Sequence, residues 1–318
     1  MTSEVITFRG RRAVSCGVRS TDSRSPPPPL PSAHVGALLR EWRAVRRLSQ
    51  LDLALEAEVS ARHLSCVETG KSQPSRDMVA RLADTLGMPL RERNALLVAA
   101  GYAPMYRETA LTTPEMASVR RAIELTLAQQ EPYPAFVMNR HWDVLLANDA
   151  AARVSNVMLR APSPHTNMLR QVFDPDSLRP AFANWEEVAG DLIRHLHDEV
   201  AAAPTDDKAR ALLEEVLRYP GIPDRWRTRE AGVAPQPLLT TVLRNDDMEL
   251  RFFSTFTTFG TPQDVTLDEL RIECTFPADE ATAQRCRALA APARRATATR
   301  KPAAKRRAAN GKRATAKR

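Results

Sequence analysis

The side chains best suited to chemistry lie within residues 49–73, SQLDLALEAEVSARHLSCVETGKSQ. Arg62 carries a guanidinium, which can donate two parallel hydrogen bonds to guanine O6 and N7. Polar groups on both sides of it suit phosphate oxygens, which fix a protein on a nucleic acid without reading its sequence. The chemistry that these residues indicate is recognition by hydrogen bonding, provided that a rigid element holds them in place.

Two serines indicate the elements that would hold them. Ser49 is a favourable N-cap for a helix that runs through Ala57, and Ser60 caps a second helix that closes at Gly70. Two short helices joined by so tight a turn are typical of a helix-turn-helix, in which the second helix lies in the DNA major groove and the first crosses the phosphate backbone. The sequence therefore predicts a DNA-reading unit.

Flanking segments predict that this unit belongs to an all-α domain of five helices. Apolar residues recur at helical spacing over 35–45, Ser75 caps a fourth helix that ends at Gly87, and a fifth helix begins at Leu90. We expect the DNA-binding domain to span residues 33–106.

This stretch resembles the phage-repressor and Cro type of helix-turn-helix domain, known in bacteria as the xenobiotic-response-element family. The motifs that carry the resemblance are Leu48-Ser49-Gln50, Val59-Ser60, Val67-Glu68-x-Gly70-Lys71 and Pro74-Ser75. The family usually has glycine where Glu58 stands, because the turn favours positive φ. We therefore expect Glu58 to add about 1 kcal/mol of local strain.

The resemblance also implies roles for individual residues. Base contacts would come from Ala61, Arg62 and Cys66, unless Arg62 touches only phosphate. Arg43 and Glu68 align with a structural ion pair of this family, the alternative being two solvated charges. The residues expected at the groove wall or the phosphates are Gln50, Ser60, His63, Ser65, Lys71, Ser72 and Gln73.

Residues 109–290 mix strand and helix patterns and predict a second domain, of the α+β class. A hairpin over 135–146 precedes two helical patterns, and three strands follow them, the last over 270–276 with clean alternation of apolar and polar residues. This domain resembles the MmyB-type ligand-binding domain of bacterial transcription regulators. The resemblance rests on YPAFVMNRHWDVLLAN (133–148), NWEEVAGDLIRHLHDEV (184–200), RYPG (218–221) and ELRFFSTFTTFGTPQDVTLDELRIECTFPAD (249–279).

The second resemblance implies a PAS-like fold with a buried pocket for a fatty-acid-like or similar apolar ligand. No cofactor is expected. The residues expected to line the pocket are Phe136, Trp142, Leu146, Asn148, Trp185, Phe253 and Phe256. Aromatic stripes usually form core, so simple packing is the alternative for the aromatic residues. Asn148 is better suited to cap the following helix than to orient a ligand.

Charge is distributed unevenly along the chain. Residues 109–292 carry 27 acidic and 19 basic side chains, so this segment is not expected to bind nucleic acid directly. Residues 293–318 carry eleven basic and no acidic side chains, which predicts a disordered tail that either binds phosphates or only solubilises the chain. Residues 1–32 are expected to form a disordered, Pro-rich arm, or to precede the true start codon.

Other chemistry finds little support. The chain has no run of about 18 apolar residues and no paired cysteine motif, so no membrane span and no disulfide framework are expected. Gly70-Lys71-Ser72 lacks the earlier glycine of a phosphate-binding loop. His195 and His197, two apart on a helix, face different directions, so no metal site is predicted. No catalytic residues are predicted either, because no Ser-His-Asp or Cys-His arrangement has supporting context.

These patterns together predict a cytoplasmic bacterial transcription regulator that binds double-stranded DNA and a small apolar ligand. A single five-helix unit reads about half a site, so we expect a homodimer on half-sites about 34–36 Å apart. One alternative is a lipid-handling enzyme or carrier that the helix-turn-helix merely localises. The other is a nucleoid-associated protein dominated by its basic tail.

Overall fold

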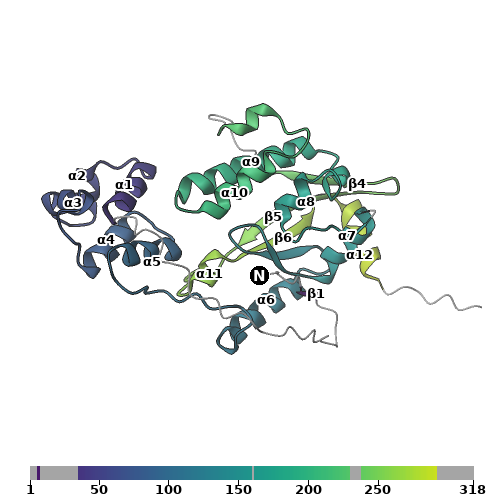
Figure 1. Ribbon diagram of the computed structural model, residues 1–318. Helices are drawn as coiled ribbons and strands as arrows, with labels where there is room; N and C mark the ends of the chain where they lie inside the picture. The colour runs from purple at the N-terminus through teal and green to yellow at the C-terminus, as the bar shows by residue number, and fades with distance from the viewer. Residues whose placement is uncertain (1–5, 8–34, 160, 230–237, 292–318) are drawn as a thin grey trace, which may run out of the picture.

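The computed structural model describes residues 6–7, 35–159, 161–229 and 238–291. A helical region and an α+β domain lie beside each other, with the helix-turn-helix at the far end of the molecule from the sheet (Figure 1). The predicted tail and most of the predicted arm lie outside the described residues. Two residues of that arm, Ile6–Thr7, form a short strand against the sheet, which the sequence did not predict.

The helical region has the five helices that the sequence predicts. They are α1 (Val35–Val45), α2 (Gln50–Glu56), α3 (Ala61–Glu68), α4 (Arg76–Thr85) and α5 (Leu90–Ala99). The side chain of Ser49 caps α2 in a reciprocal box with Asp52, and Ser60 caps α3 by accepting from the His63 N–H. The apolar faces enclose one core around Leu39, Trp42 and Leu64. The expectation of a five-helix all-α region is confirmed.

Two backbone positions set the approach of α3 to its neighbours. Glu58, in the turn between α2 and α3, has a φ of 53°, in the left-handed region that favours glycine. Gly36 on α1 lies so close to α3 that a Cβ there would stand 2.5 Å from the carbonyl oxygens of Val67 and Glu68. The recognition helix is thus held by a strained turn at one end and a close helix contact at the other.

The α+β domain is built on one sheet. Its strands are β1 (Ile6–Thr7), β2 (Ala135–Met138), β3 (Val144–Ala147), β4 (Thr240–Arg244), β5 (Glu249–Thr257) and β6 (Arg271–Pro277). The spatial order is β1-β3-β2-β6-β5-β4, and all neighbours are antiparallel except β1 and β3. The last strand therefore lies between the first hairpin and the later one. This arrangement confirms the predicted α+β class.

Helices cover both faces of the sheet. They are α6 (Ala117–Gln129), α7 (Asp149–Met158), α8 (Met168–Phe173), α9 (Trp185–Ala202), α10 (Asp207–Val216), α11 (Val265–Glu269) and α12 (Glu280–Ala290), with short 3-10 turns at Pro114–Met116, Arg179–Ala181 and Asp224–Arg227. Ile123 and Leu127 of α6 pack on one face, against Val137 and Ile272. Helices α8, α9 and α10 pack with Met138 and Trp142 on the other. Among the described residues, no helix has the length and apolar character needed to cross a bilayer.

Strand alternation decides which side chains face which layer. Phe136 of β2 stands beside Glu273 of β6, and Glu273 stands beside Phe256 of β5. These three residues share the face that α8 and α9 cover. Val137 of β2, Cys274 of β6 and Phe253 of β5 point to the other face, because side chains alternate along a strand. A pocket on the first face must therefore draw on alternate residues of the central strands.

Candidate functional site

The recognition helix α3 buries one side and exposes the other. Leu64, Val67 and Glu68 are buried, whereas Arg62 and His63 are exposed. Of the three residues expected to contact bases, Arg62 is exposed and Cys66 is half-buried, whereas Ala61 is half-buried and packs against the core of the helical region. Arg62 and Cys66 are one turn apart and so share a face.

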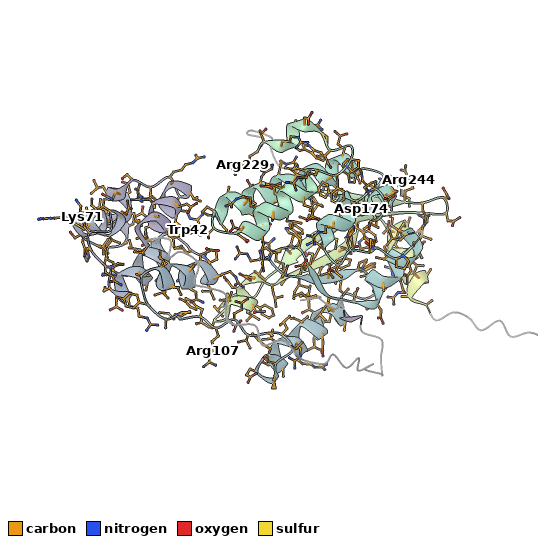
Figure 2. The ribbon with its side chains drawn as sticks, viewed as in Figure 1. Trp42, Lys71, Arg107, Asp174, Arg229 and Arg244 are labelled. Carbon is orange, nitrogen blue, oxygen red and sulfur yellow. The ribbon has the colours of Figure 1, made fainter. Side chains whose placement is uncertain are left out.

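The residues expected at the groove wall or the phosphates fall into two groups. Lys71 is exposed, at the end of the helical region that lies away from the sheet (Figure 2). Ser65, on α3, is half-buried. The hydroxyl of Ser72 lies 3.3 Å from His63 Nε2, and the hydroxyl of Ser60 is used as the cap of α3.

The other group consists of two glutamines that already have partners inside the protein. The Gln50 amide donates to Glu68 Oε2 at 3.0 Å, and the Gln73 amide donates to the Ala100 carbonyl at 2.7 Å. A carboxamide has two N–H groups and a carbonyl, so both residues keep capacity for a phosphate.

Arg43 and Glu68 form a bidentate pair between α1 and α3. Arg43 Nε lies 3.0 Å from Glu68 Oε1, and Nη2 lies 3.1 Å from Oε2. The Glu68 side chain is only 3% exposed. A paired carboxylate this deeply buried is held in one geometry, and it fixes the recognition helix against α1.

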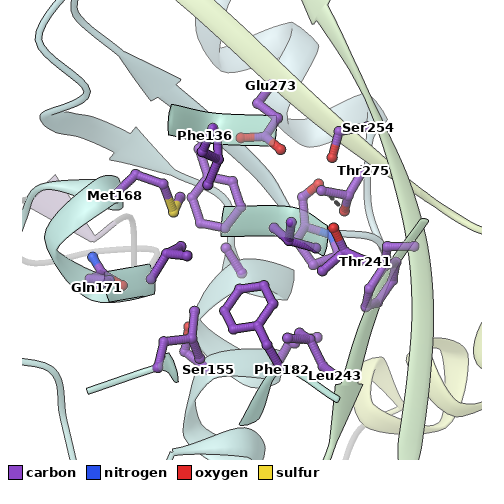
Figure 3. Close-up of a pocket in the computed structure, with 18 of the residues that line it drawn as sticks. Phe136, Ser155, Met168, Gln171, Phe182, Thr241, Leu243, Ser254, Glu273 and Thr275 are labelled. Carbon is purple, nitrogen blue, oxygen red and sulfur yellow. Dashed lines mark hydrogen bonds between the residues drawn. The ribbon is translucent and has the colours of Figure 1, made fainter. Parts of the chain in front are cut away.

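The second site is a cavity of about 250 Å³ between the sheet and helices α7, α8 and α9 (Figure 3). It is lined by Pro134, Phe136, Trp142, Ala151, Val154, Ser155, Met158, Met168, Gln171, Val172, Leu178, Phe182, Val188, Asp191, Leu192, Leu239, Thr241, Leu243, Phe252, Ser254, Phe256, Glu273 and Thr275. Sixteen of these 23 residues are apolar, so the interior suits a mainly apolar molecule.

Three of the seven residues expected to line the pocket are in this wall: Phe136, Trp142 and Phe256. Leu146 and Phe253 are not, because strand alternation turns them to the opposite face. Leu146 is paired with Val137, and Phe253 stacks on Phe276 with ring centroids 5.4 Å apart.

Trp185 and Asn148 are also outside the cavity wall. The Trp185 ring packs beside Trp226 with Arg179 over it, 3.6 Å from the ring centroid. The side-chain oxygen of Asn148, Oδ1, accepts from the backbone N–H groups of Ala151 and Ala135, both at 3.0 Å, so this residue caps α7 and joins it to β2. Leu146, Asn148, Trp185 and Phe253 therefore do not belong to the cavity wall, contrary to the expectation from the sequence.

Sequence reasoning missed the polar part of the cavity wall. Glu273, Ser254, Thr275 and Thr241 gather at the sheet, away from Ser155 and Phe182 at the other end (Figure 3). Burial raises the pKa of Glu273 although Ser254 bonds to its carboxyl group. The surface of Glu273 is only half-buried because it borders the cavity, yet protein surrounds its carboxyl group. The alternation in LRIECTF located Glu273 on the polar side of its strand, and the covering helices could not be foreseen from that pattern.

Trp142 is held firmly in the cavity wall. Its φ of 66° is in the left-handed region, and its indole N–H donates to Glu199 Oε2 at 2.9 Å. The Arg271 guanidinium lies 5.7 Å from the ring centroid. Burial works against the charged form of Glu199, but hydrogen bonds from His195 and Trp142 and the charge of Arg271 outweigh it and lower its pKa. These contacts fix the ring at the edge of the cavity.

The turn that carries Trp142 also contacts the helical region. Arg140, two residues earlier, donates to Glu269 Oε1 at 2.9 Å, pairs with Asp206, and approaches Glu92 of α5 at 3.5 Å. Glu92 in turn accepts a hydrogen bond of 2.5 Å from the Thr205 hydroxyl. Burial disfavours the charged form of Arg140, but the Glu269 and Asp206 carboxylates outweigh it and raise its pKa.

Further contacts join the two parts around this buried pair. Arg91 of α5 binds both oxygens of Glu269, at 2.6 and 3.0 Å, and the Leu90 N–H donates to Asp268 at 3.0 Å. Arg107, at the junction in Figure 2, forms a backbone bridge to Asp264. Helix α5 is therefore bonded to the same domain that holds the cavity.

Two family descriptions match the chain. Residues 34–96 match "Helix-turn-helix domain", and residues 119–289 match "MmyB-like transcription regulator ligand binding domain". No curated protein was found to match. Within the described residues, no group of three or more His, Cys, Asp or Glu side chains is placed to hold a metal ion.

A solved structure titled "Structure of an RNA-binding Light-Oxygen-Voltage Receptor" aligns with 12% identity and a TM-score of 0.23, over 80% of this chain and 62% of that one. This chain thus spans less than two thirds of the length of that structure. At so low a TM-score, the likeness supports no conclusion about this chain.

Proposed function

The chain belongs to the family of MmyB-like transcription regulators, and from this premise we propose that a small apolar ligand in the 250 Å³ cavity sets its affinity for an operator. It is a DNA-binding regulator with a helix-turn-helix domain and a ligand-binding domain, and not an enzyme. Since its partner is DNA, we place its action in the bacterial cytoplasm, at the nucleoid.

One observation carries the proposal: a single turn contacts both the cavity and the helical region. Trp142 lines the cavity, and Arg140 of the same turn is packed against Glu92 of α5. A ligand that shifts Trp142 must move this turn or strain it. Because Arg140 is buried among three carboxylates, a shift of the turn changes the contacts that hold α5. The ligand can thereby favour one placement of the DNA-binding helices over another.

Operator reading is assigned to α3. Arg62 is the exposed guanidinium on the outward face, next to Ala61 and one turn before Cys66. Lys71 and Ser72 follow the helix and suit the phosphates. Two copies of this unit on adjacent half-sites would double the contacts, so we include a homodimer in the proposal.

Linked binding provides the test. An operator is first selected from a random DNA pool with the full chain, and its affinity is then measured with and without 1-decanol, an alkyl probe for the cavity. The proposal requires that decanol change operator affinity by the same factor by which operator changes decanol affinity. Decanol that binds and leaves operator affinity unchanged would overturn the regulatory role while leaving the cavity as a binding site.

A further inference from the structure

The polar end of the cavity has a defined composition. Ser254 and Thr275 are direct cross-strand partners on β5 and β6, and Glu273 follows on the same face of β6. The Thr275 hydroxyl donates to the Pro134 carbonyl at 2.8 Å, and Ser254 bonds to the Glu273 carboxyl group. Figure 3 shows the Glu273 side chain next to the Phe136 ring at this end.

No basic side chain is present among the residues that line the described cavity; its two ionisable groups are the carboxyls of Glu273 and Asp191. Asp191 is paired with Arg194 at 3.0 Å. The guanidinium nearest to Trp142, that of Arg271, is bonded to Glu199 and is outside the cavity wall. An anion placed at the sheet would therefore lie beside a carboxyl group and without a counter-ion, which is costly in an apolar interior.

A neutral polar group at the same place would not bury an unpaired charge. Burial keeps the proton on Glu273 to higher pH than usual, because its pKa is raised. A protonated carboxyl group has one O–H to donate and a carbonyl to accept. The Ser254 hydroxyl adds a second donor and acceptor next to it. An alcohol or carbonyl oxygen at this point can be bonded without any charge being buried.

We infer that Glu273 determines the ligand specificity of this cavity and selects apolar molecules whose polar group is uncharged, an alcohol or a carbonyl, over carboxylates of the same chain length. This inference rests on the proposed function, since it names the ligand class of the same cavity. It narrows the expected fatty-acid-like ligand to an apolar molecule with a neutral polar group.

Four probes of one chain length separate the possibilities: 1-decanol, decanoate, decylamine and decane. Binding of each to the full chain is measured by titration calorimetry at neutral pH, with the melting temperature as a second readout. We expect decanol to bind about tenfold or more tighter than decanoate, because only decanoate must bury an unpaired charge.

Three variants assign the preference to Glu273. Glu273→Gln keeps a neutral donor and acceptor and should bind decanol within a few-fold of wild type. Glu273→Leu removes both and should lower decanol affinity about tenfold, towards that of decane. The control is Glu214→Leu on the exposed side of α10, which should change nothing. If Glu273→Leu does not fold, the Gln variant alone still separates a neutral contact from a charged one.

Three other outcomes would each overturn the inference. Equal affinity for decanoate and decanol would overturn the inference while leaving the cavity as an apolar site. Tight binding of decylamine that Glu273→Gln abolishes would overturn it in favour of a cationic ligand. If none of the four probes binds, decane included, the apolar-ligand proposal fails and the inference fails with it.

Discussion

Arg140, in the turn between β2 and β3, lies 3.5 Å from Glu92 of α5, and the two side chains are only 13% and 5% exposed. One belongs to the sheet domain and the other to the helical region. A buried pair across such a boundary ties the two parts in one relative position, because moving either side chain strands a charge. Trp142, two residues away, lines the cavity, so this pair joins the turn at the cavity wall to the DNA-binding helices.

Replacing Arg140 should uncouple the two sites. Arg140→Ala leaves the carboxylates of Glu92, Asp206 and Glu269 without their shared cation, and breaking a buried pair in this way costs about 3–5 kcal/mol. The effect of decanol on operator affinity should shrink, although neither binding site is touched. Operator titrations with and without decanol check this. The exposed Arg121→Ala is the control, and an undiminished decanol effect in Arg140→Ala would remove this route.

Two exposed basic residues, Arg62 on α3 and Lys71 just after it, should have different roles in DNA binding. Arg62→Ala should lose about 1–3 kcal/mol of operator affinity with little change on random DNA, because a bidentate guanine contact reads sequence. Lys71→Ala should weaken binding to both kinds of DNA alike and reduce the salt slope by about 1, because we expect Lys71 to contact phosphate. Binding is measured on both DNAs over a range of salt. An equal loss on both DNAs for Arg62→Ala would show that it contacts only phosphate.

The pair between Arg43 and Glu68 should be strongly coupled. Removing Arg43 leaves the buried Glu68 carboxylate without its cation and is expected to cost about 3–5 kcal/mol, removing Glu68 leaves a guanidinium that is 21% exposed and should cost less, and the double variant should cost less than the sum of the two. Denaturant unfolding of the two single variants and the double variant gives the coupling energy. Small, additive effects would show that the 3.0 Å contact contributes nothing.

Burial of Glu273 should make the stability of the folded chain depend on pH. The folded pKa of Glu273 is raised above its ordinary value of 4.5 by burial, so the folded chain holds this proton more tightly than the unfolded chain. Stability therefore falls as pH rises from that ordinary value to the raised one, and stays level above it. Glu273→Gln should be more stable than wild type at neutral pH, and the difference should vanish below the ordinary pKa. Thermal unfolding from about pH 4 to pH 8 measures this difference.

Two other ionisable side chains lie near Glu273, one in the same cavity wall and one next to it on the strand, so their contributions need to be separated from that of Glu273. Asp191 of α9 lines the same cavity, and Cys274, next on the strand, has a pKa raised by its own burial and by Glu273. The comparison is therefore repeated in an Asp191→Asn background. A difference between Glu273→Gln and wild type that is the same at every pH would contradict the assignment.

The sequence predicted the helical region better than the cavity. Caps such as Ser49 and Ser60 act over three residues, so their consequences can be read locally. The positive φ of Glu58 was expected from the family resemblance, since glycine usually stands at this turn, and the structure has it.

The cavity depends instead on which face of each strand is covered. Phe252 and Phe253 are adjacent and chemically identical, yet only Phe252 lines the cavity, because successive residues of β5 point to opposite faces and only one of these faces borders the cavity. Glu273 falls on the polar side of the alternation over 270–276, and it is the packing of α8 and α9 over this face that encloses it. The contact of Arg140 with Glu92, 48 positions apart in the chain, has no local signal at all.

The central claim is that occupation of the cavity changes operator affinity, and a filled cavity tests it most directly. Ser155→Phe places a ring inside the cavity from α7, and Asn156→Phe places the same ring on the exposed side of that helix. Operator affinity is measured with and without decanol in wild type and both variants. We predict a change of roughly 5- to 150-fold in wild type and Asn156→Phe, and none in Ser155→Phe. An equal decanol response in all three proteins would contradict the account.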